Sequence, residues 1–428
     1  MEVKPGYKQT EVGVIPEEWD LAQIAEVADV KTGPFGSALH ERDYVHDGTP
    51  IITVEHLNEL GVTHFNLPMV SDADCRRLRG YSLEADDIVF SRVGSVDRNA
   101  LIREAEAGWL FSGRLLRVRP NQRKALAPYL SHQFHSEPFK RRVRDVAVGQ
   151  TMASLNTQIL KNVTVVLPTI LEQCAIAAAL SDVDTLISAL DKLITKKRDI
   201  KQAAMQQLLA GRKRLPGFHG EWRTKTLGKV MTRCFSGATP RRNRPDYFKG
   251  NIRWITSGEL NYNLITDTAE KLSSEAVDRT NLKIVPKGTF LMAITGLEAE
   301  GTRGSCGIVG EPATTNQSCM AIFPTSELVT EYLFHYYVFR GKALALQYCQ
   351  GTKQQSYTTK LVKQLPIALP PTTTEQTAIA EVLSDMDAEL AALEQRRDKT
   401  RLLKQGMMQE LLTGKTRLPF DEGTPYVA

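Results

Sequence analysis

The sequence predicts an α+β protein in which one unit is written twice, each copy being a mixed domain followed by a long amphipathic helix. Three observations carry this prediction. The 428 residues exceed a typical single domain two- to three-fold. Two long segments match each other at a constant shift of 203 residues, which carries Glu172 onto Glu375. Short apolar runs broken by Gly, Pro, Asn and Asp fill the intervals and are typical of strands.

The repeat is clearest in the segments that follow each domain. The shift of 203 also carries Trp19 onto Trp222 and Tyr129 onto Tyr332, so the domains themselves are related in outline, although they barely resemble each other between these anchors. The repeat therefore indicates a constant frame that carries two divergent domains. The longest identical stretches are Ala175-Ile176-Ala177 with Ala378-Ile379-Ala380, Leu180-Ser181-Asp182 with Leu383-Ser384-Asp385, and Arg214-Leu215-Pro216 with Arg417-Leu418-Pro419.

Each matched segment has the apolar spacing of a long helix that ends near Gly211 or Gly414, a residue type suited to a left-handed cap. Such a stripe can pack on its own domain or on another helix. Two matched stripes in a chain with two domains favour antiparallel, coiled-coil-like pairing with each other, which would make a spacer. The candidate helix-pairing residues are Ile176, Leu180, Val183, Ile187, Leu190, Ile379, Leu383, Met386, Leu390 and Leu393.

The alignment also predicts how the chain is divided. Because residues 14–19 align with residues 217–222, the second helix is expected to return to the N-terminal lead-in and close a pseudo-two-fold circular arrangement. The predicted parts are a lead-in at 1–18 that packs near the C-terminus, a first domain at 19–168, a first helix at 169–218, a second domain at 219–370, a second helix at 371–420 and a tail at 421–428.

Within the domains, strands are predicted around 88–90, 115–118, 290–294 and 319–322, and helices over 129–146 and 331–349. Basic and amide side chains gather in glycine-bearing loops next to these elements. Arg and Lys suit guanine, Asn and Gln suit adenine, and any of them can hold phosphates or simply be solvated. The candidate DNA-binding residues are Arg92, Ser95, Arg98, Arg114, Arg303, Gln317, Lys353 and Gln354.

Composition and missing motifs exclude several classes of protein. The formal charge of +5 is small for this length, and no apolar run of 18 residues predicts a membrane span. The six cysteines form no Cys-x-x-Cys pair, which argues against a zinc site or a disulfide framework and favours a reducing cytoplasm. No phosphate-binding or dinucleotide-binding glycine motif occurs, and His132 and His135 are expected to be packing or surface residues. We therefore predict no catalytic residues, metal or cofactor in this chain.

The helix entries, Glu-Gln-x-x-Ile-Ala-x-x-Leu-Ser-Asp-x-Asp from Glu172 and from Glu375, and the exits, Leu-Leu-x-Gly-x-x-Arg-Leu-Pro, occur twice. Together with the domain openings at 31–37 and 236–240, they resemble the specificity subunit of Type I restriction-modification systems. The resemblance implies two target-recognition domains that each read one half of a bipartite asymmetric DNA site, and antiparallel helices that set the gap between the halves.

The same resemblance implies the partners. Two methyltransferase subunits would dock on the helices, and restriction and translocase subunits would join them for cleavage. S-adenosylmethionine, ATP and Mg²⁺ would then be bound by partner subunits only. One alternative is a tandem scaffold that binds protein or RNA, and measured affinity for duplex DNA would distinguish it from a DNA-reading subunit. Another is a self-sufficient modification enzyme, which would transfer methyl groups without a partner.

Overall fold

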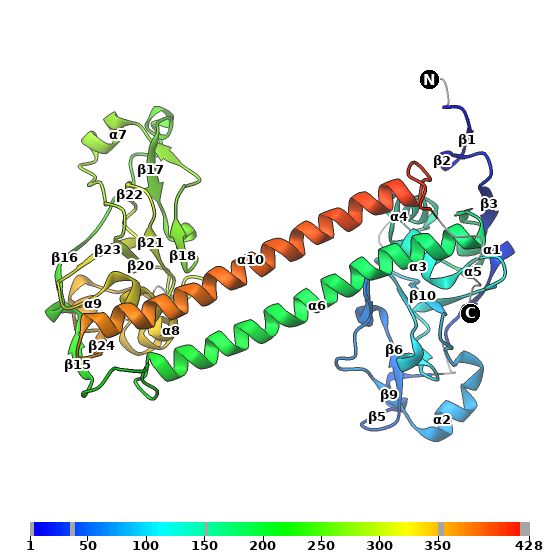
Figure 1. The fold of residues 1–428 in the computed structure, drawn as a ribbon, viewed down its shortest axis with the longest axis horizontal. Coiled ribbons are helices and arrows are strands. Elements are labelled where there is room, and N and C mark those ends of the chain that lie inside the picture. The colour runs from blue at the N-terminus through cyan, green and yellow to red at the C-terminus, as the bar shows by residue number, and fades with distance from the viewer. Residues whose placement is uncertain (1–3, 35–38, 150–152, 350–354, 420–428) are drawn as a thin grey trace. The chain divides into compact units, whose positions relative to one another are not determined.

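The computed structural model describes residues 4–34, 39–149, 153–349 and 355–419 (Figure 1). The chain divides into two compact units, and each is considered by itself. Unit 1 comprises residues 1–192 together with 394–428, and unit 2 comprises residues 193–393. The chain therefore passes from one unit to the other at 192/193 and 393/394.

Unit 1 is built around an antiparallel sheet in the order β11-β10-β13-β4, with a smaller mixed sheet in the order β12-β6-β9-β5. Its strands are β1 (Tyr7–Thr10), β2 (Gly13–Pro16), β3 (Asp20–Gln23), β4 (Ala28–Thr32), β5 (Tyr44–Val45), β6 (Thr49–Ile52), β7 (Leu57–Asn58), β8 (Gly61–Val62), β9 (Met69–Val70), β10 (Ile88–Ser91), β11 (Asn99–Leu101), β12 (Leu110–Phe111), β13 (Leu115–Pro120) and β14 (Thr164–Leu167). Its short helices are α1 (Ile24–Val27), α2 (Asp72–Arg77), α3 (Ala127–His135), α4 (Glu137–Val146) and α5 (Thr157–Lys161).

Unit 2 repeats this plan with a sheet in the order β16-β23-β20-β21-β18, whose first three strands pair antiparallel as β4, β13 and β10 do. Its strands are β15 (Arg223–Thr226), β16 (Met231–Ser236), β17 (Ile252–Ile255), β18 (Asn263–Ile265), β19 (Lys271–Leu272), β20 (Phe290–Ala293), β21 (Cys306–Val309), β22 (Ala313–Thr315), β23 (Cys319–Pro324) and β24 (Pro366–Leu369). Its short helices are α7 (Ser274–Arg279), α8 (Thr330–Tyr348) and α9 (Thr359–Gln364).

The prediction of a single helix over 129–146 in unit 1 is wrong. The structure has two helices there, α3 and α4, with Ser136 between them in an extended conformation. Pro138 lies in the first turn of α4, where its ring and missing N–H are tolerated, whereas in the middle of a single helix they would remove a hydrogen bond. In unit 2, α8 runs without a break over the equivalent residues.

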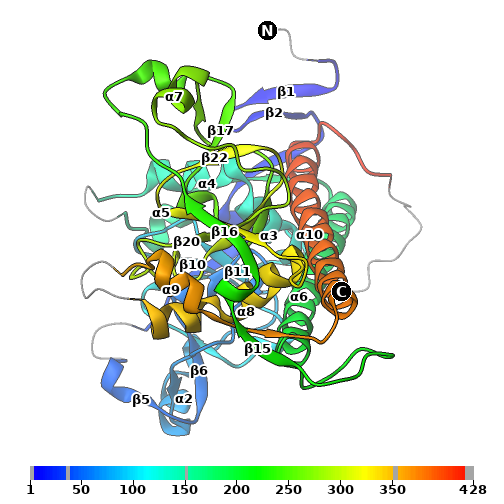
Figure 2. The same ribbon diagram turned by 90° about the vertical axis from the view of Figure 1, so that its left-hand side faces the viewer.

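Helices α6 (Ile170–Leu208) and α10 (Thr373–Leu411), each of 39 residues, run side by side in both views (Figures 1 and 2). In the ion pairs between the two helices, residues later in α6 pair with residues earlier in α10, which confirms the predicted antiparallel pairing. Both helices stop before glycines in the left-handed region, with φ of 65° at Gly211 and 69° at Gly414. In unit 1 the pairs are Asp184 with Lys404 and Asp191 with Arg397 and Arg401; in unit 2 they are Asp387 with Lys201 and Glu389 with Lys197.

The segment after α10 packs against the N-terminal lead-in within unit 1. The Tyr7 hydroxyl donates to the Gly414 carbonyl at 2.8 Å, and the Arg417 guanidinium forms ion pairs with Glu18 and Glu172. In unit 2 the equivalent segment follows α6 and continues directly into the domain. Its Arg214 forms the equivalent ion pair with Glu375 at the start of α10. Of the helices in the described ranges, none is long and apolar enough to cross a membrane.

Candidate nucleic-acid interface

Three loops of unit 1 leave its main sheet at the same edge. Strand β4 ends at Thr32, β10 ends at Ser91 and β13 begins at Leu115, and the register pairs Leu115 with Ser91 and Leu116 with Thr32. Because β13 runs antiparallel to both neighbours, its start lies beside their ends. We call the loops that emerge here edge 1.

A fourth segment, of which residues 147–149 and 153–156 are described, joins edge 1 through the loop after β10. Val93 forms an isolated bridge with Ser154, and the Gly94 amide donates to the Ala153 carbonyl at 2.8 Å. The Leu155 amide donates to the carbonyl of Arg92 at the same distance. The segment between α4 and α5 is therefore held next to the predicted DNA-binding loop.

Unit 2 has the same arrangement, which we call edge 2. Strand β16 ends at Ser236, β20 ends at Ala293 and β23 begins at Cys319, and the register pairs Ala293 with Cys319. The segment before α9 again joins in, because Thr295 bridges Ser356 and the Tyr357 amide donates to the Ile294 carbonyl. Two loop clusters of equivalent construction, one in each unit, are thus available to a ligand.

A glycine fixes the first loop of each edge. A Cβ atom on Gly33 would lie 2.1 Å from the Ser112 carbonyl oxygen, and one on Gly237 would lie 1.7 Å from that of Thr315. Real side chains do not tolerate such contacts, so only glycine allows the loop to approach this closely. The Gly33 and Gly237 positions are those that open the two predicted target-recognition domains.

Of the four candidates at edge 1, two contact backbone carbonyls and the other two are exposed on the loops. Arg92 is half-buried, and its Nη1 lies 3.4 Å from the Gly113 carbonyl, so it joins two loops of the edge. Arg98 is exposed but donates to the Leu57 carbonyl. Ser95 and Arg114 are exposed on the edge loops themselves. The structure therefore brings all four together on one edge, and their contacts with DNA stay a prediction.

The candidates of edge 2 are arranged differently. Arg303 is half-buried, and its guanidinium donates to the carbonyls of Leu297 and Glu298, both at 2.9 Å, so it holds the shape of its own loop. Gln317 is exposed and accepts from the Thr239 hydroxyl. Lys353 and Gln354 lie outside the described residues.

Aromatic stacking at edge 2 was missed in the sequence. The Arg242 guanidinium lies 4.5 Å from the ring centroid of Phe248 and 5.1 Å from that of Trp254, and it forms an ion pair with Glu270. The Trp254 indole donates to the Ala238 carbonyl in the opening loop. The basic run at 241–244 was visible in the sequence, but its stacking partners lie in a separate strand and loop.

The frame that carries these edges is built from the same polar contacts in both units. Buried side chains of α3 or α8 contact the first half of the long helix, and buried glutamines at the helix start accept backbone amides of the domain. The equivalent contacts, in unit 1 and unit 2 in turn, are His132 with Ser181 and His335 with Ser384, and Gln173 with the amide of Leu126 and Gln376 with that of Val329.

The apolar stripes divide into residues of the domain cores and residues buried farther along the helices, and the role of the individual candidates in helix pairing stays a prediction. The first members of each stripe join the core of their own domain, whereas later members are buried farther along the helix. The candidates in domain cores are Ile176, Leu180, Ile379 and Leu383; those buried farther along are Ile187, Leu190 and Leu390; and those partly exposed are Val183, Met386 and Leu393.

The buried frame histidines predict a loss of stability in mild acid. Burial lowers the pKa of His132 to about 3 and that of His335 to about 4, in surroundings that include Asp184 and Lys404 around the first. Because an unfolded histidine titrates near 6.5, the unfolded chain binds protons that the folded chain does not as pH falls below 6.5. Each histidine should therefore reduce the free energy of unfolding by about 2 kcal/mol between pH 7 and pH 5.

Urea unfolding of the wild type and of His132→Asn at the two pH values checks this expectation. Asparagine keeps a polar partner for Ser181 but does not titrate, so the variant should lose about 2 kcal/mol less than the wild type between pH 7 and pH 5. Equal losses in the two proteins would show that His132 is not the group responsible.

Among the described residues, no group of three or more His, Cys, Asp or Glu side chains is arranged to hold a metal ion. Burial raises the pKa of the Cys306 and Cys319 thiols, which keeps them protonated and unreactive. The described side chains that the two edges present to a ligand include cations, amides and hydroxyls.

Comparison with known proteins agrees with this geometry. The family model for the Type I restriction modification DNA specificity domain matches residues 16–202 and again residues 219–402. The MjaX type I restriction enzyme specificity subunit of Methanocaldococcus jannaschii is 24% identical over 429 residues, which cover 96% of this chain and 97% of that protein. The EcoR124I/EcoR124II specificity subunit of Escherichia coli is 26% identical over 172 residues, 39% of this chain and 41% of that protein.

Solved structures share the fold. The crystal structure of a Type I restriction-modification S subunit from M. genitalium aligns with a TM-score of 0.63 at 13% identity and covers 99% of both chains. A structure from work on complex assembly and conformational transition of the type I R-M system aligns with a TM-score of 0.53 at 16% identity, covering 94% of this chain and 99% of that one. Because the family model matches both copies of the repeat and together most of the sequence, the chain belongs to the family of Type I restriction-modification specificity subunits.

Proposed function

We propose that this chain reads a bipartite DNA target without catalysing a reaction, one half-site through edge 1 and the other through edge 2. One observation carries the proposal: the frame contacts are the same in both units, whereas the loops at the two edges differ in length and in side chains. A repeated frame supplies two readers of equivalent construction, as dimeric DNA-binding proteins do, and divergent loops let the two half-sites differ.

The partners follow from the same proposal. Methyltransferase subunits, two in number, would dock on the helical frame and modify adenines, and restriction and translocase subunits would bind to that assembly. Exposed leucines on the paired helices support a docking surface, because apolar patches that stay exposed to water mark interaction sites. They are Leu186, Leu402 and Leu403 in unit 1, with 40%, 69% and 59% of their surface exposed.

Cofactors belong to those partners in this proposal. S-adenosylmethionine, ATP and Mg²⁺ would be bound by the methyltransferase and translocase subunits, and this chain would contribute recognition only. The cytoplasm, where chromosomal DNA lies, is the compartment that the function implies.

The double variant Arg92→Ala/Arg98→Ala tests edge 1. Arg92 organises the edge loops and Arg98 adds a cation to them, so we expect affinity for the cognate duplex to fall about 10- to 100-fold. The slope of log K against log salt should also become shallower by about one or two. Electrophoretic mobility shifts at several salt concentrations, with the methyltransferase subunit present, provide the measurement.

Arg123→Ala is the matched control. Arg123 is exposed beyond Pro120, at the opposite end of β13 from edge 1, and its loss should change neither quantity. If the edge variant binds DNA as the wild type does, edge 1 is not a DNA interface. Affinity for RNA or protein in place of duplex DNA would instead support the scaffold alternative.

A further inference from the structure

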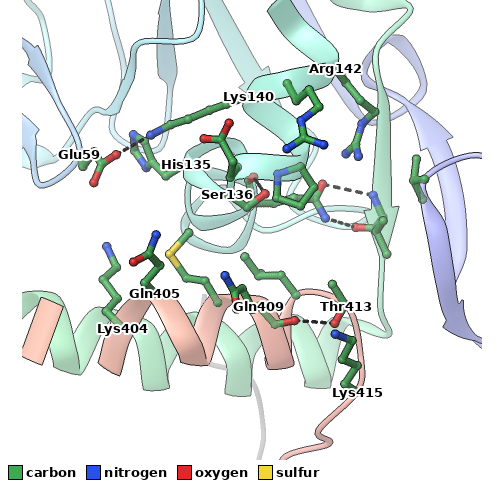
Figure 3. Close-up of a pocket in the computed structure, with 18 of the residues that line it drawn as sticks. Glu59, His135, Ser136, Lys140, Arg142, Lys404, Gln405, Gln409, Thr413 and Lys415 are labelled. Carbon is green, nitrogen blue, oxygen red and sulfur yellow. Dashed lines mark hydrogen bonds and ion pairs between the residues drawn. The ribbon is translucent and has the colours of Figure 1, made fainter. Parts of the chain in front are cut away.

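A groove of about 950 Å³ lies within unit 1, between the domain and the last turns of α10 (Figure 3). Its walls come from the β1–β2 hairpin, the turn between β7 and β8, and the corner between α3 and α4. Figure 3 shows Gln405 and Gln409 of α10 facing Lys140 and Arg142 of α4 across the groove. It is separate from edge 1, because none of the described residues of the edge 1 loops lines it.

The groove carries an excess of positive charge. Six basic and three acidic side chains line it, and each of the three acids is already paired: Glu59 with Lys140, Glu137 with Arg144 and Asp184 with Lys404. Arg141 and Lys415 are exposed and form no ion pair with any described residue.

Arg142 is a third basic side chain in the groove, and it can donate a further hydrogen bond. It is half-buried against the Phe139 ring, and its Nε is a buried donor without a hydrogen-bond partner in the described residues. Glu11, the carboxylate that acts on it through space, accepts a hydrogen bond from Thr164. A buried guanidinium donor without an acceptor is costly, so an acceptor supplied by a ligand would be favourable.

Apolar side chains form the rest of the lining. Ile15, Ile187 and Leu412 line the groove and are buried, whereas Val14 remains 42% exposed. An occupant that removes Val14 from water gains hydrophobic free energy in addition to its charge contacts. The groove therefore suits a ligand that carries both carboxylates and apolar groups.

The two arginines of α4 that line the groove have no basic equivalent among the described residues of unit 2. At the shift of 203, Arg141 and Arg142 correspond to Leu344 and Ala345, which belong to the unbroken helix α8 and are buried in the core. In unit 1, Pro138 starts a separate helix, α4, and this helix turns its cations to the groove. The basic residues of α4 thus distinguish this helix from the equivalent part of α8.

We propose that this groove binds an acidic, apolar-anchored polypeptide segment of a methyltransferase subunit. Its volume is several times that of a phosphate or a carboxylate ion, and its apolar lining residues offer nothing to a DNA backbone, whereas a short peptide can contact both the cations and the apolar side chains. The inference rests on the proposed function, because the groove borders the helices on which that subunit would dock. It makes the two methyltransferase positions unequal, with the tighter one on unit 1.

Charge reversal tests the proposal with a control taken from the repeat itself. Arg141→Glu/Lys415→Glu places two carboxylates at the groove, whereas Arg212→Glu changes the residue equivalent to Lys415 in unit 2. We expect the double variant to bind one of its two methyltransferase subunits about 10- to 100-fold more weakly, as measured by native mass spectrometry over a concentration series. Arg212→Glu should leave both affinities unchanged.

Equal losses in the two variants, or no loss in either, would overturn the proposal. A loss of DNA affinity by the double variant in the absence of the methyltransferase would also overturn it, because the groove would then be a DNA contact. The failure of the proposed function is distinguishable, since it would show as wild-type DNA binding by the edge variant Arg92→Ala/Arg98→Ala. Unfolding midpoints of both charge variants check that the fold persists.

Photocrosslinking identifies the occupant directly. A photoreactive phenylalanine at Gln409, which is exposed in the groove, should crosslink in the assembled complex to a segment of the methyltransferase rich in Asp and Glu. Crosslinks only to residues 420–428 of this chain, to a restriction subunit or to DNA would contradict the proposal. So would the absence of any crosslink in a complex that methylates DNA.

Discussion

Arg417→Ala is expected to destabilise unit 1 by about 3 kcal/mol and to leave unit 2 unchanged. The Arg417 Nε donates to the Glu172 carboxylate at 2.6 Å, and Trp19 donates to the other oxygen at 3.1 Å. Glu172 is buried, so removing the guanidinium leaves a carboxylate whose remaining donors, the Trp19 indole and the amide and hydroxyl of Thr169, are all neutral. We expect the lower end of the range for a broken buried pair because the Arg417 side chain is 35% exposed and water can enter in its place.

The equivalent change in the other unit is the matched control. Arg214 forms a two-point contact with Glu375, at 2.5 Å and 2.6 Å, and the Glu375 side chain is fully buried. Arg214→Ala should therefore destabilise unit 2 and spare unit 1. Hydrogen exchange of core peptides in increasing urea separates the two units. If Arg417→Ala weakened both units alike, the view that each is closed by its own arginine would be wrong.

A paired insertion in the long helices is expected to change the target itself. We propose seven residues, two helical turns, after Lys192 in α6 and after Leu393 in α10, where the chain passes between the units. The Asp184–Lys404 and Lys201–Asp387 pairs remain on their own sides of the insertions. The added 10 Å or so of helix should lengthen the gap between half-sites by up to about three base pairs.

Sequencing of methylated adenines in cells that carry the variant and its methyltransferase reads out both the gap and the half-sites. Both half-sites should persist, because the edge loops are untouched. An insertion in α6 alone, which shifts the helices against each other, is the control and should lower methylation without a defined new gap. An unchanged gap in the paired variant would contradict the role of the helices as the element that sets spacing.

The sequence predicted the features that depend on local pattern. The matched stripes from Ile176 and Ile379 predicted two long helices, and Gly211 and Gly414 predicted where they end, because a left-handed cap favours glycine whatever surrounds it. The family resemblance followed from the same residues. Matching contacts such as His132 with Ser181 then appeared twice, as a true repeat requires.

Features that depend on long-range packing could not be predicted in this way. Arg303 appeared to be a free cation on a glycine-rich loop, but it holds the carbonyls of Leu297 and Glu298, whose positions only the folded loop defines. The groove of unit 1 needs α4, α10 and the N-terminal hairpin together, so no stretch of sequence contains its pattern. The interruption at Pro138, by contrast, was visible and could have been predicted.

The most direct test of the central claim is a map of methylated adenines made with the wild type and with a chain whose edge 2 loops are replaced by those of a relative. If separate units read the two half-sites, the wild type should direct methylation to a bipartite asymmetric sequence. The exchanged chain should change one half and keep the other half and the gap. A contiguous target, or a change in both halves after the exchange at edge 2, would contradict the assignment of one half-site to each unit.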